Sequence, residues 1–172
     1  MRIIDLTQPI KHQMPVYPGD PEVSVEIVQT HDSHTWELRR LSLGSHTGSH
    51  VDAFSHMHEG MADLDQIPLT RFLGPAVVVR VGEAWPEGVG LLFLEDVGLE
   101  LLERLVTARP NFVGGRLSED IERALLERGI ITYTDLINLE LIPPGVRFFF
   151  IGLPLRIAQG DGSPVRAIAV LD

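Results

Sequence analysis

The chain contains no cysteine and no long apolar run. Without cysteine it has no disulfide framework, no thiolate nucleophile and no thiolate metal ligand. No apolar stretch approaches the roughly 20 residues that a membrane-spanning helix needs. Residues 1–5 include an acid where a signal peptide requires apolar side chains. We therefore expect a soluble, cytoplasmic protein without a membrane partner.

Positive charge is also scarce. The 24 Asp and Glu residues outnumber the 14 Lys and Arg residues, which gives a net charge of −10. A negative field of this size opposes binding to phosphate backbones, so we expect no nucleic-acid partner. At 172 residues and 44% hydrophobic content, the chain is long enough for one domain with its own core. We predict a single domain over residues 1–172.

Histidine, by contrast, is concentrated in one segment. Four of the seven histidines lie between residues 46 and 58, together with Asp52. Neutral imidazole and ionised carboxylate are the usual ligands of zinc, manganese and iron. A histidine-rich surface turn is the alternative, but the order HxxxHxD…H favours a metal site. The histidines expected instead at the solvated surface are His12, His31, His34 and His58.

Two local structures would assemble part of such a site. His46, His50, Asp52 and His56 have the same parity, so an unbroken strand would place all four on one face. Gly48 is expected to break that strand and to fold His46 back toward the others. In a helix, the pairs 46 with 50 and 52 with 56 would each be four residues apart, on different faces. Either structure needs further ligands from elsewhere in the fold.

Hydrophobic periodicity predicts mainly strands, with two helices in the second half. Alternation over residues 23–28 and 36–43 is typical of half-buried strands, and the β-branched run 75–81 of a more central one. An apolar stripe predicts a helix over 95–107, and capping residues predict another over 118–129. Shorter strands are expected at 2–6, 130–133, 147–153 and 165–171, with a hairpin turn at 159–163. This pattern indicates an α/β fold with helices packed on a mixed β-sheet.

The histidine segment resembles the signature of the metal-dependent cyclase family, which includes kynurenine formamidase. The family motif HxGTHxDxPxH is matched here by His46-Thr-Gly-Ser-His50-Val-Asp52-Ala-Phe-Ser-His56. Residues 5–20, 67–79 and 153–168 are similar to three further family segments. The resemblance implies a three-layer β/β/α sandwich that hydrolyses a small amide, such as N-formylkynurenine in tryptophan catabolism or a related cyclic amide.

The same resemblance implies roles for individual residues. His46, His50 and Asp52 would bind a divalent ion, zinc or manganese, and His56 would be the general acid/base. Such an ion lowers the pKa of its water toward 7, and a histidine then carries the proton to the leaving amine. Tyr17 would pack on the small-molecule substrate. The resemblance also implies a homodimer or a higher homo-oligomer.

Two positions depart from the family pattern. The family's glutamate ligand falls at Thr134, and the neighbouring Asp135 is expected on the opposite face of the strand. The family's second-metal histidine falls near Glu122, which would be either a displaced ligand or a solvated helix residue. We therefore expect one ion, held by the motif and by Glu122 or water. A non-catalytic protein that binds a small molecule or only assembles is the alternative to a hydrolase.

Overall fold

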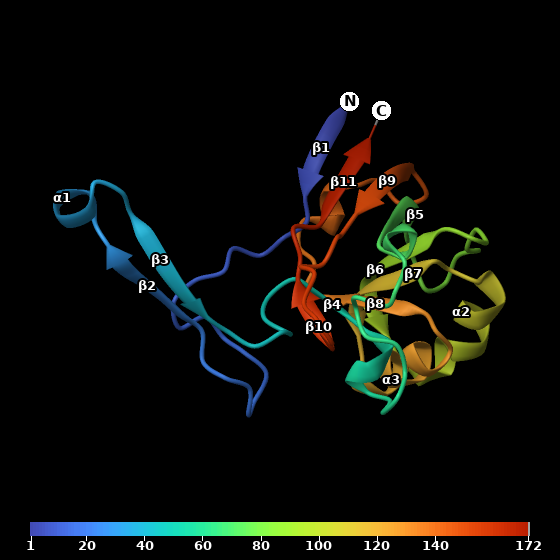
Figure 1. Ribbon diagram of the computed structural model, residues 1–172. Helices are drawn as coiled ribbons and strands as arrows, with labels where there is room; N and C mark the ends of the chain where they lie inside the picture. Colours follow the sequence, from blue (N-terminus) through green and yellow to red (C-terminus); the bar gives the residue numbers. More distant parts are fainter. Residues whose placement is uncertain (172) are drawn as a thin grey trace.

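Most strands of the chain join one mixed β-sheet. The computed structural model describes residues 1–171, and in these residues the strand order is β1-β11-β9-β5-β6-β7-β8-β4-β10. Neighbours from β5 to β8 pair in parallel and the others pair antiparallel. The strands are β1 (Arg2–Asp5), β4 (His50–Asp52), β5 (Leu73–Val79), β6 (Gly90–Val97), β7 (Phe112–Leu117), β8 (Ile131–Thr134), β9 (Arg147–Ile151), β10 (Gly162–Pro164) and β11 (Ile168–Leu171). Figure 1 shows the two chain ends side by side, on β1 and β11.

Helices cover one face of this sheet. Along β5, Val77 packs into a core on the helical side, whereas Val78 packs into a core on the other side, as strand alternation requires. Helices α2 (Leu102–Ala108) and α3 (Glu119–Glu127) contribute Leu105, Ala108, Ile121 and Leu125 to the first core. Four short 3-10 helices are η1 (Phe54–His56), η2 (Leu69–Arg71), η3 (Leu99–Leu101) and η4 (Leu139–Leu141). No helix within residues 1–171 has both the length and the apolar character needed to cross a bilayer.

The opposite face of the sheet closes on itself. Ile4 of β1 and Ala169 of β11 share one buried cluster with Val51 of β4 and Tyr133 of β8. These strands lie toward opposite ends of the strand order. The two ends of one sheet share a core only when the sheet curls, which produces two β layers beneath the helical layer. The predicted α/β fold with its β/β/α layers is confirmed.

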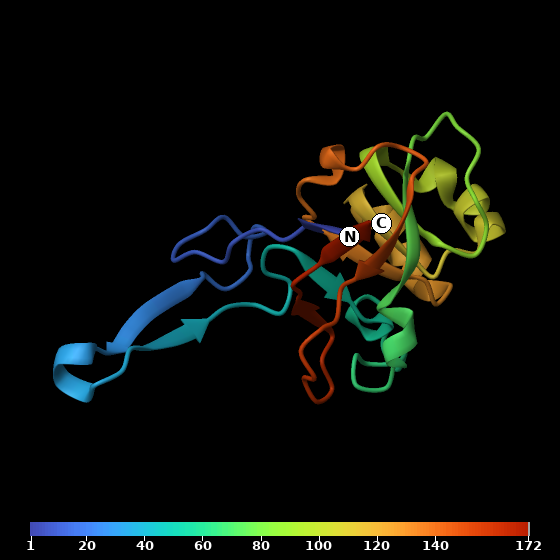
Figure 2. The same ribbon diagram turned by 90° about the horizontal axis from the view of Figure 1, so that it is seen from above.

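A two-stranded arm, formed by β2 (Ser24–Gln29) and β3 (Leu38–Ser42), projects from this body. Among the described residues these strands pair only with each other, and helix α1 (His31–His34) lies at the tip. Figures 1 and 2 both show the arm extending away from the large sheet. The predicted strands are confirmed. The predicted half-burial is right for Val23, which is 1% exposed, but wrong for much of the arm. Ile27 is 50% and Leu41 is 59% exposed, because no second layer lies against the arm.

Two further predictions from periodicity are corrected by the sheet. The helix expected from residue 95 begins only at Leu102, because Asp96 and Val97 extend β6 by pairing in parallel with β7. The predicted closing strands do pair, as β9 with β11. The segment 159–163 is not their hairpin turn, however, because Gly162–Pro164 forms β10 and pairs with β4. This pairing places the segment beside the histidine motif.

Candidate metal centre

Three local conformations bring the motif residues together. His50 and Asp52 lie two apart on β4, and the His50 Nε2 atom is 3.5 Å from Asp52 Oδ1. Gly48 has a φ of +60°, a left-handed conformation that favours glycine, and breaks the strand as predicted. The chain before it returns, so that His46 Nδ1 lies 2.8 Å from Asp52 Oδ1. His56 follows on η1.

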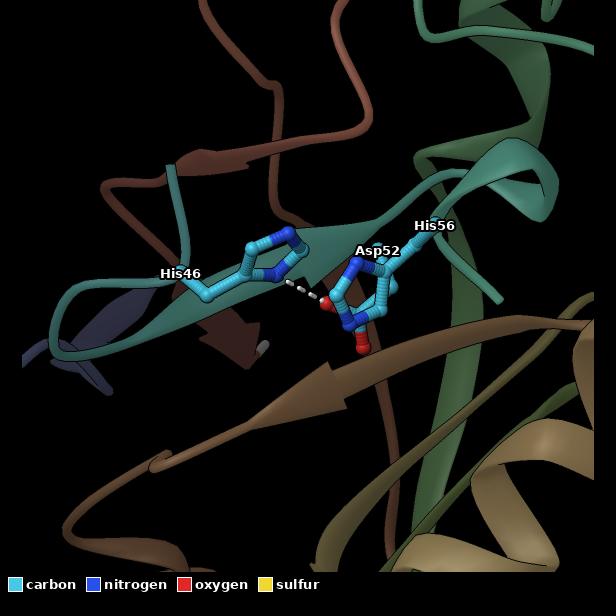
Figure 3. A group of neighbouring side chains, drawn as sticks. All are labelled: His46, Asp52 and His56. Carbon is cyan, nitrogen blue, oxygen red and sulfur yellow. Dashed lines mark hydrogen bonds and ion pairs between the residues drawn. The ribbon is translucent and has the colours of Figure 1, made fainter. Parts of the chain in front are cut away.

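Figure 3 shows His46, Asp52 and His56 pointing toward one another. One donor atom from each side chain lies within 4.8 Å of the other two. The rings of His46 and His56 have centroids 3.7 Å apart and are tilted by 32°. Two imidazoles and a carboxylate at this spacing form a donor set suited to zinc or manganese. The residues therefore fit the divalent ion that the motif implies.

His50 lies outside that group of three, although one of its ring nitrogens, Nε2, faces the same Oδ1 atom of Asp52. Its Nδ1 lies 2.6 Å from the carbonyl oxygen of Gly48, which only accepts, so Nδ1 carries the proton. The lone pair of Nε2 then points toward Asp52 and lies 2.7 Å from the hydroxyl of Thr134. A backbone hydrogen bond of this kind is the usual way to fix the tautomer of a histidine ligand.

Asp52 is the buried anion at the centre of the cluster. Only 2% of the residue is exposed, and its Oδ2 accepts a 2.7 Å hydrogen bond from Thr132 on β8. Burial alone would raise the pKa of Asp52, but the hydrogen bond from His46 and the charges of His50 and His46 lower it overall. For His46, burial lowers the pKa, whereas the hydrogen bonds and charges of Asp52 and Asp161 raise it to about 9. Without metal, an ion pair joins His46 to Asp52.

The pKa of His56 is shifted in the opposite direction from that of His46. Burial and the neighbouring positive charge of His46 lower its pKa, and the opposing effects of Asp52 and Asp161 do not compensate. The His56 imidazole is therefore neutral near pH 7 and is able to accept a proton. Its side chain is 29% exposed, which leaves it open to a molecule in the cavity.

A cavity of about 660 Å³ opens directly onto these residues. Tyr17 forms part of its wall, is 67% exposed and donates a 3.4 Å hydrogen bond to Glu119. The volume lies within the usual range of small-molecule sites. Further lining residues are Pro15, Val16, Asp20, Met57, Leu117 and Arg123.

The two positions that depart from the family pattern also line this cavity. Thr134 lies opposite His50 in the β4–β8 pairing. The prediction that Asp135 would face away is wrong: β8 ends at Thr134, Asp135 has a φ of +55°, and both residues border the cavity. Strand alternation therefore does not apply to Asp135.

Glu122 belongs to the cavity as well, rather than to the solvated face of α3. It is half-buried, and its Oε1 atom is buried without a hydrogen-bond partner among the described residues. Burial, followed by the negative charges of Asp52, Asp135 and Glu119, raises the pKa of Glu122 to about 8. A carboxyl group with these neighbours is stabilised by a proton or by a cation.

The Cyclase family model matches residues 4–114 of the chain. The chain belongs to this cyclase family. It is 31% identical to the kynurenine formamidase of Salinibacter ruber, over 98% of this chain and 97% of that protein. It is 28% identical to the kynurenine formamidase of Bacillus mycoides, over 96% of this chain and 95% of that protein.

Solved structures of cyclase-like hydrolases have the same fold. Isatin hydrolase A from Labrenzia aggregata superposes with a TM-score of 0.84 at 22% identity, covering 99% of this chain and 94% of that chain. A potential metal-dependent hydrolase with cyclase activity superposes with a TM-score of 0.78 at 25% identity, covering 98% and 96%. The family resemblance predicted from the motif is confirmed.

Sequence reasoning missed one member of the cluster, Asp161. Its Oδ2 atom lies 3.0 Å from His46 Nε2 and 3.5 Å from His56 Nδ1. The available signal was an aspartate flanked by glycines in a segment similar to a family signature, which we interpreted as a hairpin turn. His58 stays outside the cluster, where its Nε2 donates to the carbonyl of Arg123 at 2.7 Å.

Proposed function

We propose that this cyclase-family chain is a metal-dependent hydrolase of a small amide, with N-formylkynurenine or a related cyclic amide as its substrate. The convergence of His46, Asp52 and His56 beside a 660 Å³ cavity is the observation that carries this proposal. The kynurenine formamidases matched along nearly the whole chain support the reaction class, hydrolysis of a carbon–nitrogen bond outside peptides.

One zinc or manganese ion would be held by Nδ1 of His46, Nε2 of His50 and a carboxylate oxygen of Asp52. When bound, such an ion supplies a water of lowered pKa and polarises the substrate carbonyl. Thr132 keeps the Asp52 carboxylate oriented, and the Gly48 carbonyl keeps the tautomer of His50. We propose a single ion, because Thr134 supplies only a hydroxyl where the family has a carboxylate.

Glu122 is the proposed additional ligand. Its carboxyl group borders the same cavity and has a buried oxygen without a partner among the described residues. A cation in the cavity would stabilise its ionised form, which burial otherwise disfavours. Asp135 contributes further negative charge near Glu122.

His56 is the proposed general acid/base. Its lowered pKa keeps the ring neutral near pH 7, so it is able to take a proton from water and return it to the leaving amine. The ring lies against that of His46 and is partly exposed to the cavity. Tyr17, on the wall of the cavity, would pack against the aryl or acyl part of the substrate.

Metal analysis combined with a hydrolysis assay tests this proposal. We expect stoichiometric zinc or manganese in the purified protein and hydrolysis of N-formylkynurenine, both lost in His50→Ala. His12→Ala, at an exposed position away from the cavity lining, is the matched control. A metal-free protein without hydrolase activity, as stable as its His50→Ala variant, would contradict the proposal and favour the non-catalytic alternative.

The predicted homodimer or higher homo-oligomer is also a proposal. A two-stranded ribbon is only marginally stable when it packs against nothing, yet β2 and β3 pair with no other strand in the described residues. Ile27 and Leu41 lie on one face of this arm and are at least half exposed. A second copy of the chain would cover that face. The cytoplasmic location stays a prediction.

A further inference from the structure

The segment 160–163 lies beside the metal-binding motif without a role in the proposed reaction. Gly162 pairs with Asp52 across β10 and β4, and the amide of Ala53 donates to the carbonyl of Asp161 at 2.8 Å. The carbonyl of Gly160 accepts from the amide of Leu64 at 2.9 Å. Backbone hydrogen bonds therefore hold the segment in register with the metal ligands on β4.

Two features of this segment meet on the ring of His46. The Asp161 Oδ2 atom lies 3.0 Å from Nε2, on the side of the ring away from Asp52. Gly162 leaves the space that the ring occupies: a Cβ atom there would lie 2.3 Å from Cε1 of His46 and 2.8 Å from each ring nitrogen. No side chain other than hydrogen fits at position 162 while His46 keeps this place.

From these contacts we infer that Asp161 and Gly162 position His46, so that its Nδ1 lone pair faces the metal ion. This inference rests on the proposed function. A carboxylate only accepts from a ring N–H, so Asp161 keeps the proton on Nε2 when an ion replaces the Nδ1 proton that Asp52 accepts in the metal-free protein. A carboxylate that orients a metal-bound histidine in this way is a recurring feature of metal sites.

Comparison with His50 shows why the protonated nitrogen of His46 matters. His50 is held by the Gly48 carbonyl on Nδ1 and therefore presents Nε2. His46 must present the other nitrogen, Nδ1, to reach the same carboxylate oxygen of Asp52. The two histidines thus need opposite tautomers, and for His46 the acceptor on Nε2 is Asp161.

Asp161 acts through His46 and is not itself part of the donor group. The two nitrogens of one imidazole point in different directions, so an ion on Nδ1 is out of reach of the oxygen on Nε2. The same Oδ2 lies 3.5 Å from Nδ1 of His56, so one carboxylate oxygen faces both stacked rings. The Asp161 side chain is 49% exposed, whereas that of His46 is 15% exposed.

Zinc titration of the metal-free protein tests the inference. We expect Asp161→Asn to weaken zinc affinity by about 10- to 100-fold, the range found when the carboxylate behind a histidine ligand is lost. Gly162→Ala is expected to weaken it as well, with Asp161 intact. Asp65→Asn removes an exposed carboxylate near Leu64 and is the charge-matched control, expected to bind zinc as the unchanged chain does. Circular dichroism at each step checks that every variant is folded.

Nitrogen-15 spectra of the histidine rings supply a readout that a merely structural role would not change. We expect the zinc-loaded protein to show His46 protonated on Nε2, and Asp161→Asn to show a mixture of tautomers. Equal zinc affinity and an unchanged tautomer in folded Asp161→Asn would overturn this inference and leave the proposed function standing. Loss of all zinc binding in that variant would make Asp161 a ligand and also overturn it. Absence of zinc binding by the unchanged chain would overturn both.

Discussion

His56 lies within reach of both the proposed metal donors and the cavity. It belongs to the group of donor atoms within 4.8 Å, yet its pKa is lowered and its ring is partly exposed. A ligand and a proton carrier are different roles, and removal of the side chain separates them. A ligand is needed for binding the ion, whereas a proton carrier is needed only for turnover.

We predict that His56→Ala retains metal and loses turnover. General acid–base catalysis contributes about 10²- to 10⁴-fold, so kcat should fall by that factor while metal content is unchanged. Metal analysis and steady-state kinetics on one preparation measure both. His58→Ala is the control, since the His58 side chain hydrogen-bonds to a backbone carbonyl outside the cluster. Loss of metal from His56→Ala would show that His56 is a ligand.

Glu122 makes the metal-free protein sensitive to pH. Its pKa in the folded state is about 8, against 4.5 for an ordinary glutamate. Between these values the folded chain keeps a proton that the unfolded chain releases. The unfolding free energy therefore falls as pH rises through this window, and the loss is complete above pH 8.

We predict that Glu122→Gln stabilises the metal-free protein at high pH. The gain should be about 1 to 3 kcal/mol above pH 8 and should disappear below pH 4.5, where glutamate is neutral in both states. Urea unfolding of both proteins across this pH range measures the difference. A difference that does not vary with pH would show that the buried carboxyl group is not the cause. Weaker metal binding by the same variant would support Glu122 as a ligand.

At the scale of elements, the arm formed by β2 and β3 has two different faces. Val25 pairs with Leu41 and Ile27 with Arg39 on one face, whereas Glu26 pairs with Arg40 on the other face. Glu26 and Arg40 also form an ion pair at 2.5 Å. An amphipathic ribbon buries its apolar face when a partner is present, and the polar face stays in water.

We predict that Ile27→Lys weakens self-association of the chain. Exposure of a side chain of this size costs about 1.5 to 3 kcal/mol, so the dissociation constant of the oligomer should rise at least tenfold. Light scattering during size-exclusion chromatography measures the mass. Ser42→Lys adds the same charge to the polar face and should leave the mass unchanged. A monomeric unchanged chain, or equal masses for the two variants, would rule out the apolar face as the contact.

At the scale of the whole molecule, the ion would join segments that are distant in the sequence. His46 and Asp52 belong to the first half of the chain, Glu122 comes from α3, and β8 supplies the hydroxyls that hold Asp52 and His50. An ion that binds only the folded state stabilises all of these contacts together.

We predict that zinc raises the thermal midpoint of the metal-free protein by about 5 to 10 °C at a free concentration 100 times the dissociation constant. Differential scanning calorimetry with and without zinc measures the shift. His50→Ala, which lacks one proposed ligand, should show little or no shift. An equal shift in both proteins would place the ion elsewhere in the chain.

The features that depend on neighbouring residues are predictable from the sequence alone. The spacing of His46, His50, Asp52 and His56 predicts the cluster because four ligand-type side chains in eleven residues rarely serve the surface alone. Gly48 as the breaking point also follows from local sequence, since a left-handed turn favours glycine. The strands of the arm follow from alternation, which is a property of neighbouring residues.

Predictions from hydrophobic periodicity are wrong where strand pairing and packing in the sheet determine the conformation or the burial. The apolar spacing over residues 95–107 predicts a helix, but parallel pairing of Asp96 and Val97 with β7 keeps the start of that segment in a strand. Strand alternation predicts that Asp135 faces away from Thr134, but the alternation stops one residue earlier because β8 ends at Thr134. The arm was expected to be half-buried because its alternation is the same whether or not a second layer covers it.

The sequence by itself determined the ligand types, the family and the α/β class, because these depend on residue identity and on short-range spacing. Only the tertiary structure decided that Asp161 meets His46, since 115 residues separate them and the β4–β10 pairing joins them. It also decided that Glu122 and Asp135 border one cavity, because burial and charge proximity arise from chain packing and not from local pattern.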